Sequence, residues 1–326
     1  MTIMHDLKVK GYASYDKLKT CLVGRSYNRN QFSHIKNRKV QDILFRILDE
    51  TEEDYLNLCK VLEIAGVEVH RPDILDVDTS RRPANQPRDD MAVIGETLYV
   101  NNNRPEYKTL LDRIQNKVFV DECQEKKLVS TSFIHRLGSS LHWGTHQTGW
   151  RDSKLVQKYQ EQWTAEGFDV DVMEHVGHGD CTWCVPKEGC IVTLFEIQNY
   201  KDKFPGWDIC YLEDKYWDQL SPFRKVKQKN GGKWWVPGEE DSDDFSEYVE
   251  TYLKDWVGYV EETVFEVNML SIDQNTILVN NYNKKVFDFL EKHHIAPVIA
   301  PFRHRWFWDG GVHCVTQDLY RERLYT

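Results

Sequence analysis

Two hydrophobic patterns alternate along the chain. In the first, an apolar stripe with helical spacing is followed by the alternating apolar positions typical of a strand. It occurs from about residue 40 to 65 and on into GVEVHRP, in LVQKYQEQWTAEG before FDVDVMEH, and in NKKVFDFLEKHHI before APVIAPF. Each copy predicts a helix, a short turn and a strand.

The second pattern is a hairpin of two short apolar strands around a polar turn. The turns are Gly95-Glu96, residues 186–189 and residues 273–275, and their residue types suit tight turns. Related hairpins recur roughly every 90 residues and alternate with the helix–strand units. Repetition of this kind favours a pseudo-symmetric α/β assembly over a doubly wound sheet.

Residues from about 213 to 250 interrupt the pattern. The stretch KQKNGGKWWVPGEEDSDDF is polar, contains glycine and ends in an acidic run. It predicts a surface insertion, partly mobile, in one domain that spans residues 1–326. The acidic run is typical of a solvated loop, with cation binding as the alternative. Trp234 and Trp235 either cover a pocket or pack locally.

Composition and charge narrow the classes of function. No apolar run reaches the length of about 18 residues that a membrane span needs, and the N-terminal residues lack the apolar stretch of a signal peptide. We therefore expect a cytoplasmic protein whose eight cysteines are reduced. The 42 Lys and Arg residues against 52 Asp and Glu give a net charge of −10, which disfavours nucleic acid and favours a cationic small molecule.

The segment WDGGVHCVTQD near the end of the chain is the first candidate for chemistry. Gly310 and Gly311 permit either a close backbone approach or a positive φ. His313 and Cys314 follow them, which suits a cysteine nucleophile. The alternative is a buried structural cysteine, because cysteine is among the most buried residue types.

The segment EHVGHGDCTW is the second candidate. In an extended backbone, His178 and Asp180 lie on one face, which places an imidazole beside a carboxylate. A histidine of this kind serves as a general acid and base near neutral pH, whereas the alternative is a structural histidine. Cys181-x-x-Cys184 resembles half of a zinc site. No second such pair occurs, and a strand would direct the two thiols to opposite faces, so we expect no metal.

The segment NQPRDDMAVIG is the third candidate. Arg88 and Asp89 stand directly before an apolar strand. A carboxylate at the mouth of a strand can hold a guanidinium through paired hydrogen bonds. A surface turn is the alternative interpretation.

These three motifs, in this order, resemble the amidinotransferase family, which includes glycine amidinotransferase and inosamine-phosphate amidinotransferase. That family belongs to the pentein superfamily, together with the arginine and agmatine deiminases. The matching residues are Pro87-Arg88-Asp89, His178-Gly179-Asp180 and the GGVHC segment that ends at Cys314. The resemblance covers most of the chain from about residue 15, except the 213–250 region.

The resemblance implies a five-bladed ββαβ propeller with pseudo-fivefold symmetry and its site at the centre. It implies that Cys314 is the nucleophile and His178 the general acid and base. It implies that Asp89 and Asp180 bind the guanidinium, and we add Arg88, Glu266 and His313 to the expected substrate-binding residues.

Two departures from the family stand out. Its D-A-A-[DN] motif, whose first Asp orients the catalytic His, aligns with residues 130–138, where no carboxylate occurs. Its arginine for the donor's α-carboxylate aligns with IVTLFEIQNYKDK, which offers only lysines. Glu266 stands where the family often has a small polar residue, so we expect it to supply a compensating carboxylate.

The sequence therefore predicts an amidinotransferase that moves an amidino group from arginine or a related guanidino donor to an amine acceptor through an amidino-cysteine. A deiminase-like hydrolase of the same fold and a non-catalytic pentein-fold binding protein are the alternatives. We expect no cofactor. Members of the family often form dimers or larger assemblies, so a homo-oligomer is included among the expectations.

Overall fold

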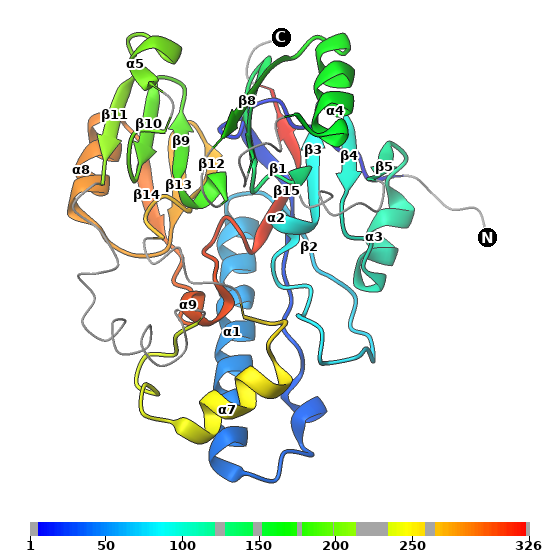
Figure 1. Ribbon diagram of the computed structural model, residues 1–326. Coiled ribbons are helices and arrows are strands. Elements are labelled where there is room, and N and C mark those ends of the chain that lie inside the picture. Colours follow the sequence, from blue (N-terminus) through cyan, green and yellow to red (C-terminus); the bar gives the residue numbers. More distant parts are fainter. Residues whose placement is uncertain are drawn as a thin grey trace.

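The strands form five small sheets of three strands each (Figure 1). The computed structural model describes residues 6–120, 128–145, 152–174, 178–197, 199–212, 234–257 and 265–323. In every sheet the second strand is antiparallel to the first and parallel to the third. The sheets are β15 (Thr316–Glu322), β1 (Lys17–Val23), β2 (Glu68–His70); β3 (Met91–Ile94), β4 (Thr97–Val100), β5 (Lys117–Phe119); β6 (Ile134–Leu137), β7 (Ser140–Thr145), β8 (Asp169–Glu174); β9 (Trp183–Lys187), β10 (Cys190–Thr193), β11 (Asp208–Tyr211); and β12 (Leu270–Asp273), β13 (Thr276–Val279), β14 (Ala296–Ile299).

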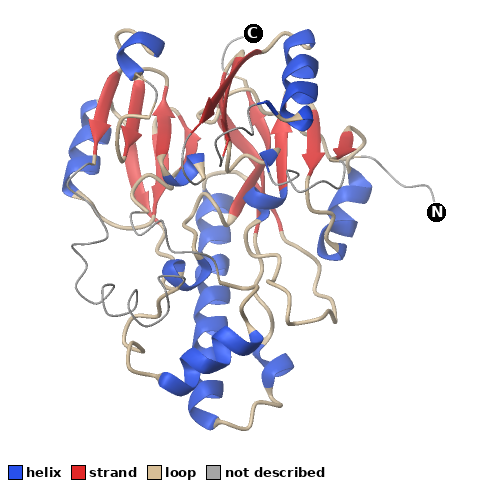
Figure 2. Cartoon of the chain, in the orientation of Figure 1, coloured by secondary structure: helices blue, strands red, loops and turns tan. Residues whose placement is uncertain are grey.

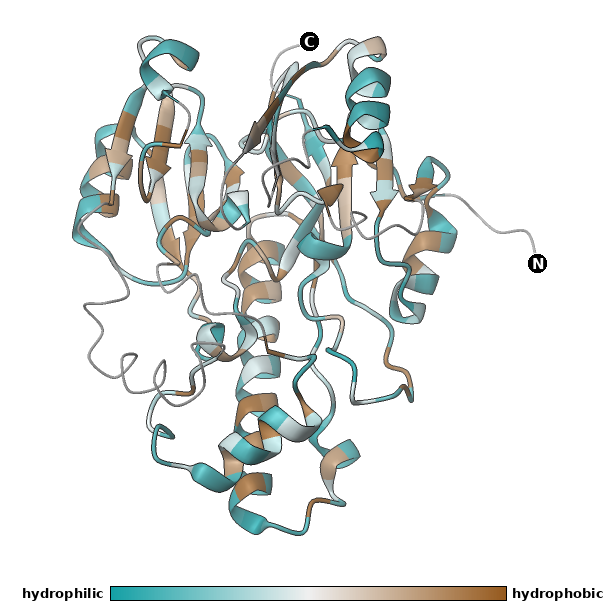
Figure 3. Ribbon diagram, in the orientation of Figure 1, coloured by the Kyte–Doolittle hydropathy of each residue, from teal (hydrophilic) through white to brown (hydrophobic). Residues whose placement is uncertain are grey.

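A helix separates the second and third strands of each sheet, so every blade reads ββαβ. These helices are α1 (Arg38–Ile64), α3 (Lys108–Arg113), α4 (Lys154–Ala165), α5 (Tyr200–Lys203) and α8 (Lys284–Lys292). Figure 2 shows α3, α4, α5 and α8 toward the outside of the sheets and α1 running downward from their middle, and Figure 3 shows apolar residues concentrated on the strands. The predicted five-bladed ββαβ propeller is confirmed.

The hairpin turns lie where their chemistry predicts them. Gly95 and Gly189 adopt φ of 60° and 85°, which only glycine adopts without strain. In the third predicted turn, the Asp273 carboxylate accepts a hydrogen bond from the backbone N–H group of Asn275 at 2.8 Å. A further hairpin, β6–β7, turns at Gly138 with φ of 74°. The remaining blade joins the two ends of the chain, since β15 pairs with β1.

The long helix α1 extends well beyond the sheets (Figure 1). It begins at the cap of Asn37, whose side chain accepts from the backbone N–H groups of Lys39 and Val40. One face is buried, at spacings of three and four residues, while the other carries charged side chains. In the described residues, no helix is long and apolar enough to cross a membrane.

The segment predicted as a surface insertion lies partly against α1. Residues 213–233 fall outside the described ranges. From residue 234 on, the chain packs on α1, and α7 (Asp243–Tyr252) crosses its far end (Figure 1). Trp234 and Trp235 are 2% and 6% exposed and belong to the same hydrophobic cluster as α1, so these two side chains pack locally.

A buried ion cluster occupies the centre of the propeller. Asp318 on β15 is completely buried and pairs with Arg88, Arg136 and Arg321, each of which is at most 2% exposed. Arg321 also donates to the Ser271 carbonyl on β12 at 2.9 Å. The cluster therefore connects residues from several blades. The segments that precede the first strand of each blade lie around it.

Candidate active site

Five short segments converge at the centre, and each directly precedes the first strand of a blade. They are α2 (Pro87–Asp90) before β3, residues 130–133 before β6, η5 (Gly179–Cys181) before β9, residues 265–269 before β12, and loop 309–315, which follows α9 (Arg305–Trp308), before β15. All three motifs selected from the sequence lie in these segments. The repeat thus explains why motifs more than 200 residues apart can form one site, as the 88–313 contact illustrates.

Hydrogen bonds join neighbouring segments directly. The Asp180 amide donates to the Ser132 carbonyl at 3.1 Å, and the Arg88 amide donates to the Cys314 carbonyl at 3.4 Å. The Asn268 side-chain oxygen accepts from the Cys314 amide at 3.3 Å. The backbone around the thiol is therefore held from two other blades.

Gly310 and Gly311 allow this close approach. A Cβ on Gly310 would lie 2.0 Å from Nε2 of Gln86, and one on Gly311 would lie 2.6 Å from Oδ1 of Asn268. Neither glycine is among those with positive φ. Of the two interpretations of the glycine pair, close backbone approach is confirmed.

The Cys314 thiol is 1% exposed, but its neighbours are polar. The side-chain amide of Asn268 donates to Sγ at 3.0 Å, and Sγ lies 3.5 Å from Oδ2 of Asp180. The Cys181 Sγ is 3.7 Å away. An amide donor at this distance favours a thiolate, which is the reactive form of cysteine.

Among the described residues, Asp180 is a buried carboxyl that forms no ion pair with an arginine, although the charge of Arg88 lowers its pKa in part. Burial, together with the nearby Asp89 carboxylate, raises the pKa of Asp180 to about 7. Its Oδ2 forms a 2.7 Å hydrogen bond with Nδ1 of His313. Burial and the Arg88 charge hold the pKa of His313 well below its usual value, so this imidazole is neutral.

His178 lies at the more exposed side of the site. Its Nδ1 is 3.6 Å from Oδ1 of Asp89, and its ring meets the Phe133 ring edge-on at 4.7 Å between centroids. The side chains of His178 and Asp89 are 35% and 26% exposed. The segment that lacks the family's carboxylate thus supplies an aromatic side chain against His178, and Asp89 supplies a carboxylate 3.6 Å from Nδ1 of the imidazole.

Arg88 and Glu266, the other two predicted binding residues, use their charged groups to bind other parts of the protein. Arg88 donates from Nε to the His313 carbonyl at 3.1 Å and from Nη1 to Asp318 at 2.6 Å, so its guanidinium supports the Cys314 loop. Glu266 accepts from the side-chain amides of Asn281 and Asn283, both at 3.4 Å, rather than from a residue of the thiol cluster.

Asn268 is the site residue that the sequence analysis missed. It is completely buried and contacts Cys314, Cys181 and Asp180 through one side chain. Its signal in the sequence is weak but present: it is the polar residue in the otherwise apolar run VNML, two positions after Glu266.

One group in the described residues has the geometry to hold a metal ion. An oxygen of Asp180 and the sulfurs of Cys181 and Cys314 lie within 4.8 Å of one another. Cys184 is not part of this group; it packs in a hydrophobic cluster with Cys190 and Cys210 and also lines the small cavity at the centre. The Cys181-x-x-Cys184 pair therefore does not converge on one point.

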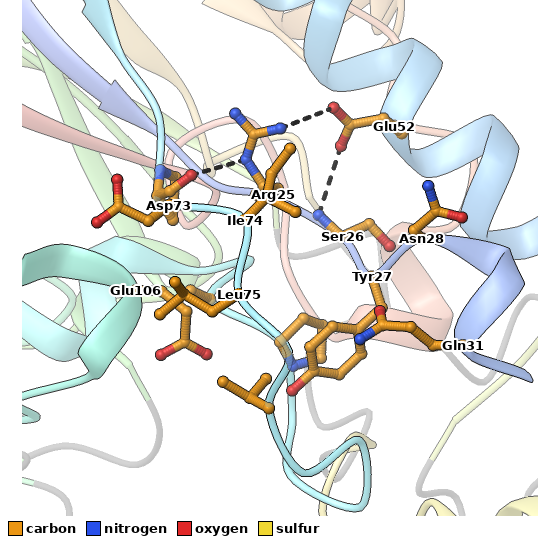
Figure 4. Close-up of a pocket in the computed structure, with 14 residues that line it drawn as sticks. Arg25, Ser26, Tyr27, Asn28, Gln31, Glu52, Asp73, Ile74, Leu75 and Glu106 are labelled. Atoms are coloured by element: carbon orange, nitrogen blue, oxygen red, sulfur yellow. Dashed lines mark hydrogen bonds and ion pairs between the residues drawn. The ribbon is translucent and has the colours of Figure 1, made fainter.

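Two cavities were found near these elements. A space of about 20 Å³, enough for one water molecule, is lined by Arg88, Asp180 and His313 at the centre. A larger cavity of about 230 Å³ lies beside α1 and the chain that follows β2, and Figure 4 shows the Arg25–Glu52 ion pair in its wall. Its lining contains none of the predicted site residues.

Comparison with models of protein families gives no match, and no curated protein matches the sequence. Solved structures do match. An inosamine-phosphate amidinotransferase from Streptomyces griseus is 17% identical, with a TM-score of 0.66 and 97% of each chain covered. An amidinotransferase from Microseira wollei, of a saxitoxin biosynthetic pathway, is 14% identical over 98% of each chain, also with a TM-score of 0.66. A dimethylarginine dimethylaminohydrolase from Pseudomonas aeruginosa, complexed with citrulline, is 10% identical over 92% of this chain and 98% of its own, with a TM-score of 0.56. This chain therefore has the pentein fold that these amidinotransferases and this hydrolase share.

Proposed function

We propose that the protein transfers an amidino group from a guanidino donor, such as arginine, to an amine acceptor, with Cys314 as the nucleophile. The observation that carries the proposal is the contact of the Cys314 thiol with Asp180 and Asn268 at the meeting point of the blades. A cationic guanidinium and an acidic pocket attract each other, and the donor then lies against the thiol.

The first step is activation of the guanidinium. Its positive charge is delocalised, which makes the central carbon a poor electrophile. Asp89 and Asp180 accept hydrogen bonds from its nitrogens and localise that charge on one side. Arg88 takes no part in this step; it positions the loop through its bonds to the His313 carbonyl and Asp318.

The second step is attack by sulfur. The Cys314 thiolate, supported by the Asn268 amide, adds to the central carbon and gives a tetrahedral species. His178 donates a proton to the departing amine, and an amidino-cysteine remains. The Asp89 carboxylate beside Nδ1 favours the protonated imidazole that this step needs.

The third step returns the enzyme to its starting state. His178 takes a proton from the incoming nucleophile, which attacks the amidino carbon and releases the thiolate. An amine acceptor completes a transfer, and a water molecule completes a hydrolysis. A cytoplasmic location, where thiols are kept reduced, would keep Cys314 available as the nucleophile.

The test is to supply arginine with a panel of amines and to follow ornithine and citrulline. Ornithine together with a new guanidino compound is the expected result. The intact mass of the protein during turnover should rise by one amidino group, and the label should map to Cys314. Ornithine with urea, from attack of water on the amidino-cysteine, or citrulline with ammonia would instead establish the hydrolase alternative.

Two variants make the test decisive. Cys314→Ala should lose both turnover and the mass adduct, because no sulfur remains to attack. Cys184→Ala removes another buried cysteine from a different environment and should keep both. Turnover that survives in Cys314→Ala, or no turnover and no adduct with any donor in the intact protein, would refute the proposal.

A further inference from the structure

Cys181 stands beside the proposed nucleophile. Its Sγ lies 3.7 Å from the Cys314 Sγ, although the two residues are 133 positions apart in the chain. The Asn268 amide donates to both sulfurs, at 3.2 Å to Cys181 and 3.0 Å to Cys314. Each cysteine is 1% exposed. The two thiols therefore share one polar enclosure.

The local structure explains why Cys181 faces Cys314. Cys181 is the last residue of η5, and the residue before it, Asp180, also contacts Cys314. Cys184 follows three positions later but belongs to β9 and packs in a hydrophobic cluster. The turn η5 thus places the Cys181 thiol beside Cys314, whereas Cys184, on the strand that follows, is not part of this thiol group although it lines the small central cavity.

We propose that Cys181 and Cys314 form a reversible disulfide when a peroxide oxidises the Cys314 thiolate. The thiolate attacks one oxygen of hydrogen peroxide, the O–O bond breaks, and hydroxide leaves with the electron pair, so that sulfur becomes a sulfenic acid. The Cys181 sulfur then attacks the Cys314 sulfur; its proton joins the departing hydroxyl, and water leaves as the S–S bond forms. In total, two thiols and one peroxide give one disulfide and two waters.

The geometry needs little movement for this step. A disulfide has an S–S length of about 2.05 Å, so the sulfurs must approach by about 1.7 Å. Cys181 closes the short turn η5, and Cys314 lies in the loop between α9 and β15, so side-chain rotation breaks no strand ladder. Asp180, 3.5 Å from the Cys314 sulfur and with a pKa of about 7, can hold a proton during the exchange.

Access of the oxidant follows from the proposed reaction. Hydrogen peroxide is smaller than a guanidinium group, so any path that admits the donor also admits the peroxide. A neighbouring thiol that reacts with the sulfenic acid protects Cys314 from the irreversible sulfinic and sulfonic acids. The disulfide would remove the nucleophile until a thiol reductant restores it. The access of peroxide and the effect on turnover rest on the proposed function, whereas the 3.7 Å distance between the two sulfurs does not.

The experiment treats the full-length protein with an equimolar amount of hydrogen peroxide. Intact mass should fall by two hydrogens per chain, and digestion without reductant should give one peptide pair linked through Cys181 and Cys314. Turnover should fall at least tenfold and return to its starting level with a thiol reductant. The peptide map does not depend on turnover, so a protein without activity would still test the disulfide.

Cys181→Ser and Cys184→Ser are the matched variants, and each is compared with its own untreated activity. Cys181→Ser should form no linked pair, and when the peroxide is raised to several equivalents it should lose turnover irreversibly, because a second peroxide converts the Cys314 sulfenic acid to the sulfinic acid. Cys184→Ser should behave like the unaltered protein. A peroxide-treated unaltered protein with sulfinic acid at Cys314 and a reduced Cys181, or with Cys314 linked to another cysteine, would overturn the inference.

Discussion

Two buried carboxylates at the centre of the propeller have opposite surroundings. Asp318 contacts Arg88, Arg136 and Arg321, and although burial alone would raise its pKa, these three charges hold the pKa of Asp318 well below its usual value. Asp180 has the neutral His313 and two thiols beside it, and its pKa rises to about 7.

The comparison distinguishes a buried carboxylate that stabilises the fold from a buried carboxyl that is suited to binding and chemistry. Both carboxyls are almost fully buried, so depth alone does not decide their roles. An ion that is fully compensated stays ionised and fixes the positions of neighbouring segments. A carboxyl left without a compensating cation is ready to receive one, which is the property that a guanidinium site needs. The difference lies in the neighbours: three arginines form ion pairs with Asp318, whereas Asp180 feels the Arg88 charge only at a distance and lies near the Asp89 carboxylate.

The largest expected effect comes from Asp318→Asn. This change leaves three buried guanidinium groups without their carboxylate, which should cost about 3–5 kcal/mol in the free energy of unfolding. Asp112→Asn is the matched control, because that carboxylate pairs with an exposed lysine, Lys108, and should cost less than about 1 kcal/mol. Urea denaturation at neutral pH measures both. Equal losses would show that the ion cluster is not special.

The second prediction concerns pH. Asp180 has a native pKa of about 7, above the value of about 3.9 in an unfolded chain, so the native state binds more protons between these values. The free energy of unfolding that Asp180 contributes is therefore fully present below about pH 3.9 and is lost as the pH rises through about 7. Relative to Asp180→Asn, the unaltered protein should lose about 2–3 kcal/mol between pH 5 and pH 8.

Asp318 provides the contrast for this measurement. Its pKa is depressed, so it is ionised in both the native and the unfolded state over the same window, and its contribution to stability is lost only as the pH falls below the unfolded value. Urea denaturation at several pH values should thus give a sloping difference for Asp180→Asn and a flat one for Asp318→Asn. A flat difference for both would mean that Asp180 is ionised throughout.

Much of the fold follows from local sequence. Helical stripes, alternating strands and the turns at Gly95 and Gly189 are short-range features, and their repetition indicates five similar units once the resemblance is taken into account. The resemblance, rather than the local sequence, implied that the site motifs meet at the centre; in the structure each of them precedes the first strand of a blade. The segment HRLGSSLHW carries the same turn signal at Gly138, although above it is interpreted only through the carboxylate that it lacks.

The identity of side-chain partners could not be predicted. Arg88 pairs with Asp318 across 230 positions, and nothing in either local sequence indicates this contact. Arg88 was therefore expected to bind substrate, whereas its guanidinium faces the ion cluster. The local sequence presents Cys181 only as half of a possible zinc site, because its neighbour Cys314 comes from another blade. The role of a residue cannot be predicted from local sequence when it depends on a partner that is distant in the chain.

The smallest expected effect tests the link between the two regions. Thr131 is 2% exposed; its hydroxyl donates to Oε1 of Gln317 at 2.6 Å and accepts from Nη1 of Arg88 at 3.2 Å. Thr131→Val keeps the shape and removes these hydrogen bonds, which should cost about 1–2 kcal/mol in urea denaturation. Turnover should stay within about threefold, because Asp318 and the His313 carbonyl still hold Arg88.

The matched variant for this last change is Thr193→Val on β10. That threonine is completely buried and bonds to the Phe195 carbonyl and the Tyr200 hydroxyl, so its loss should cost a similar amount without touching Arg88. If Thr131→Val lowers turnover tenfold or more while Thr193→Val does not, small shifts of Arg88 reach the thiol through the His313 carbonyl. The structural and chemical carboxylates would then be coupled, and Arg88 would act as a positioning residue for Cys314 as well as a partner of Asp318.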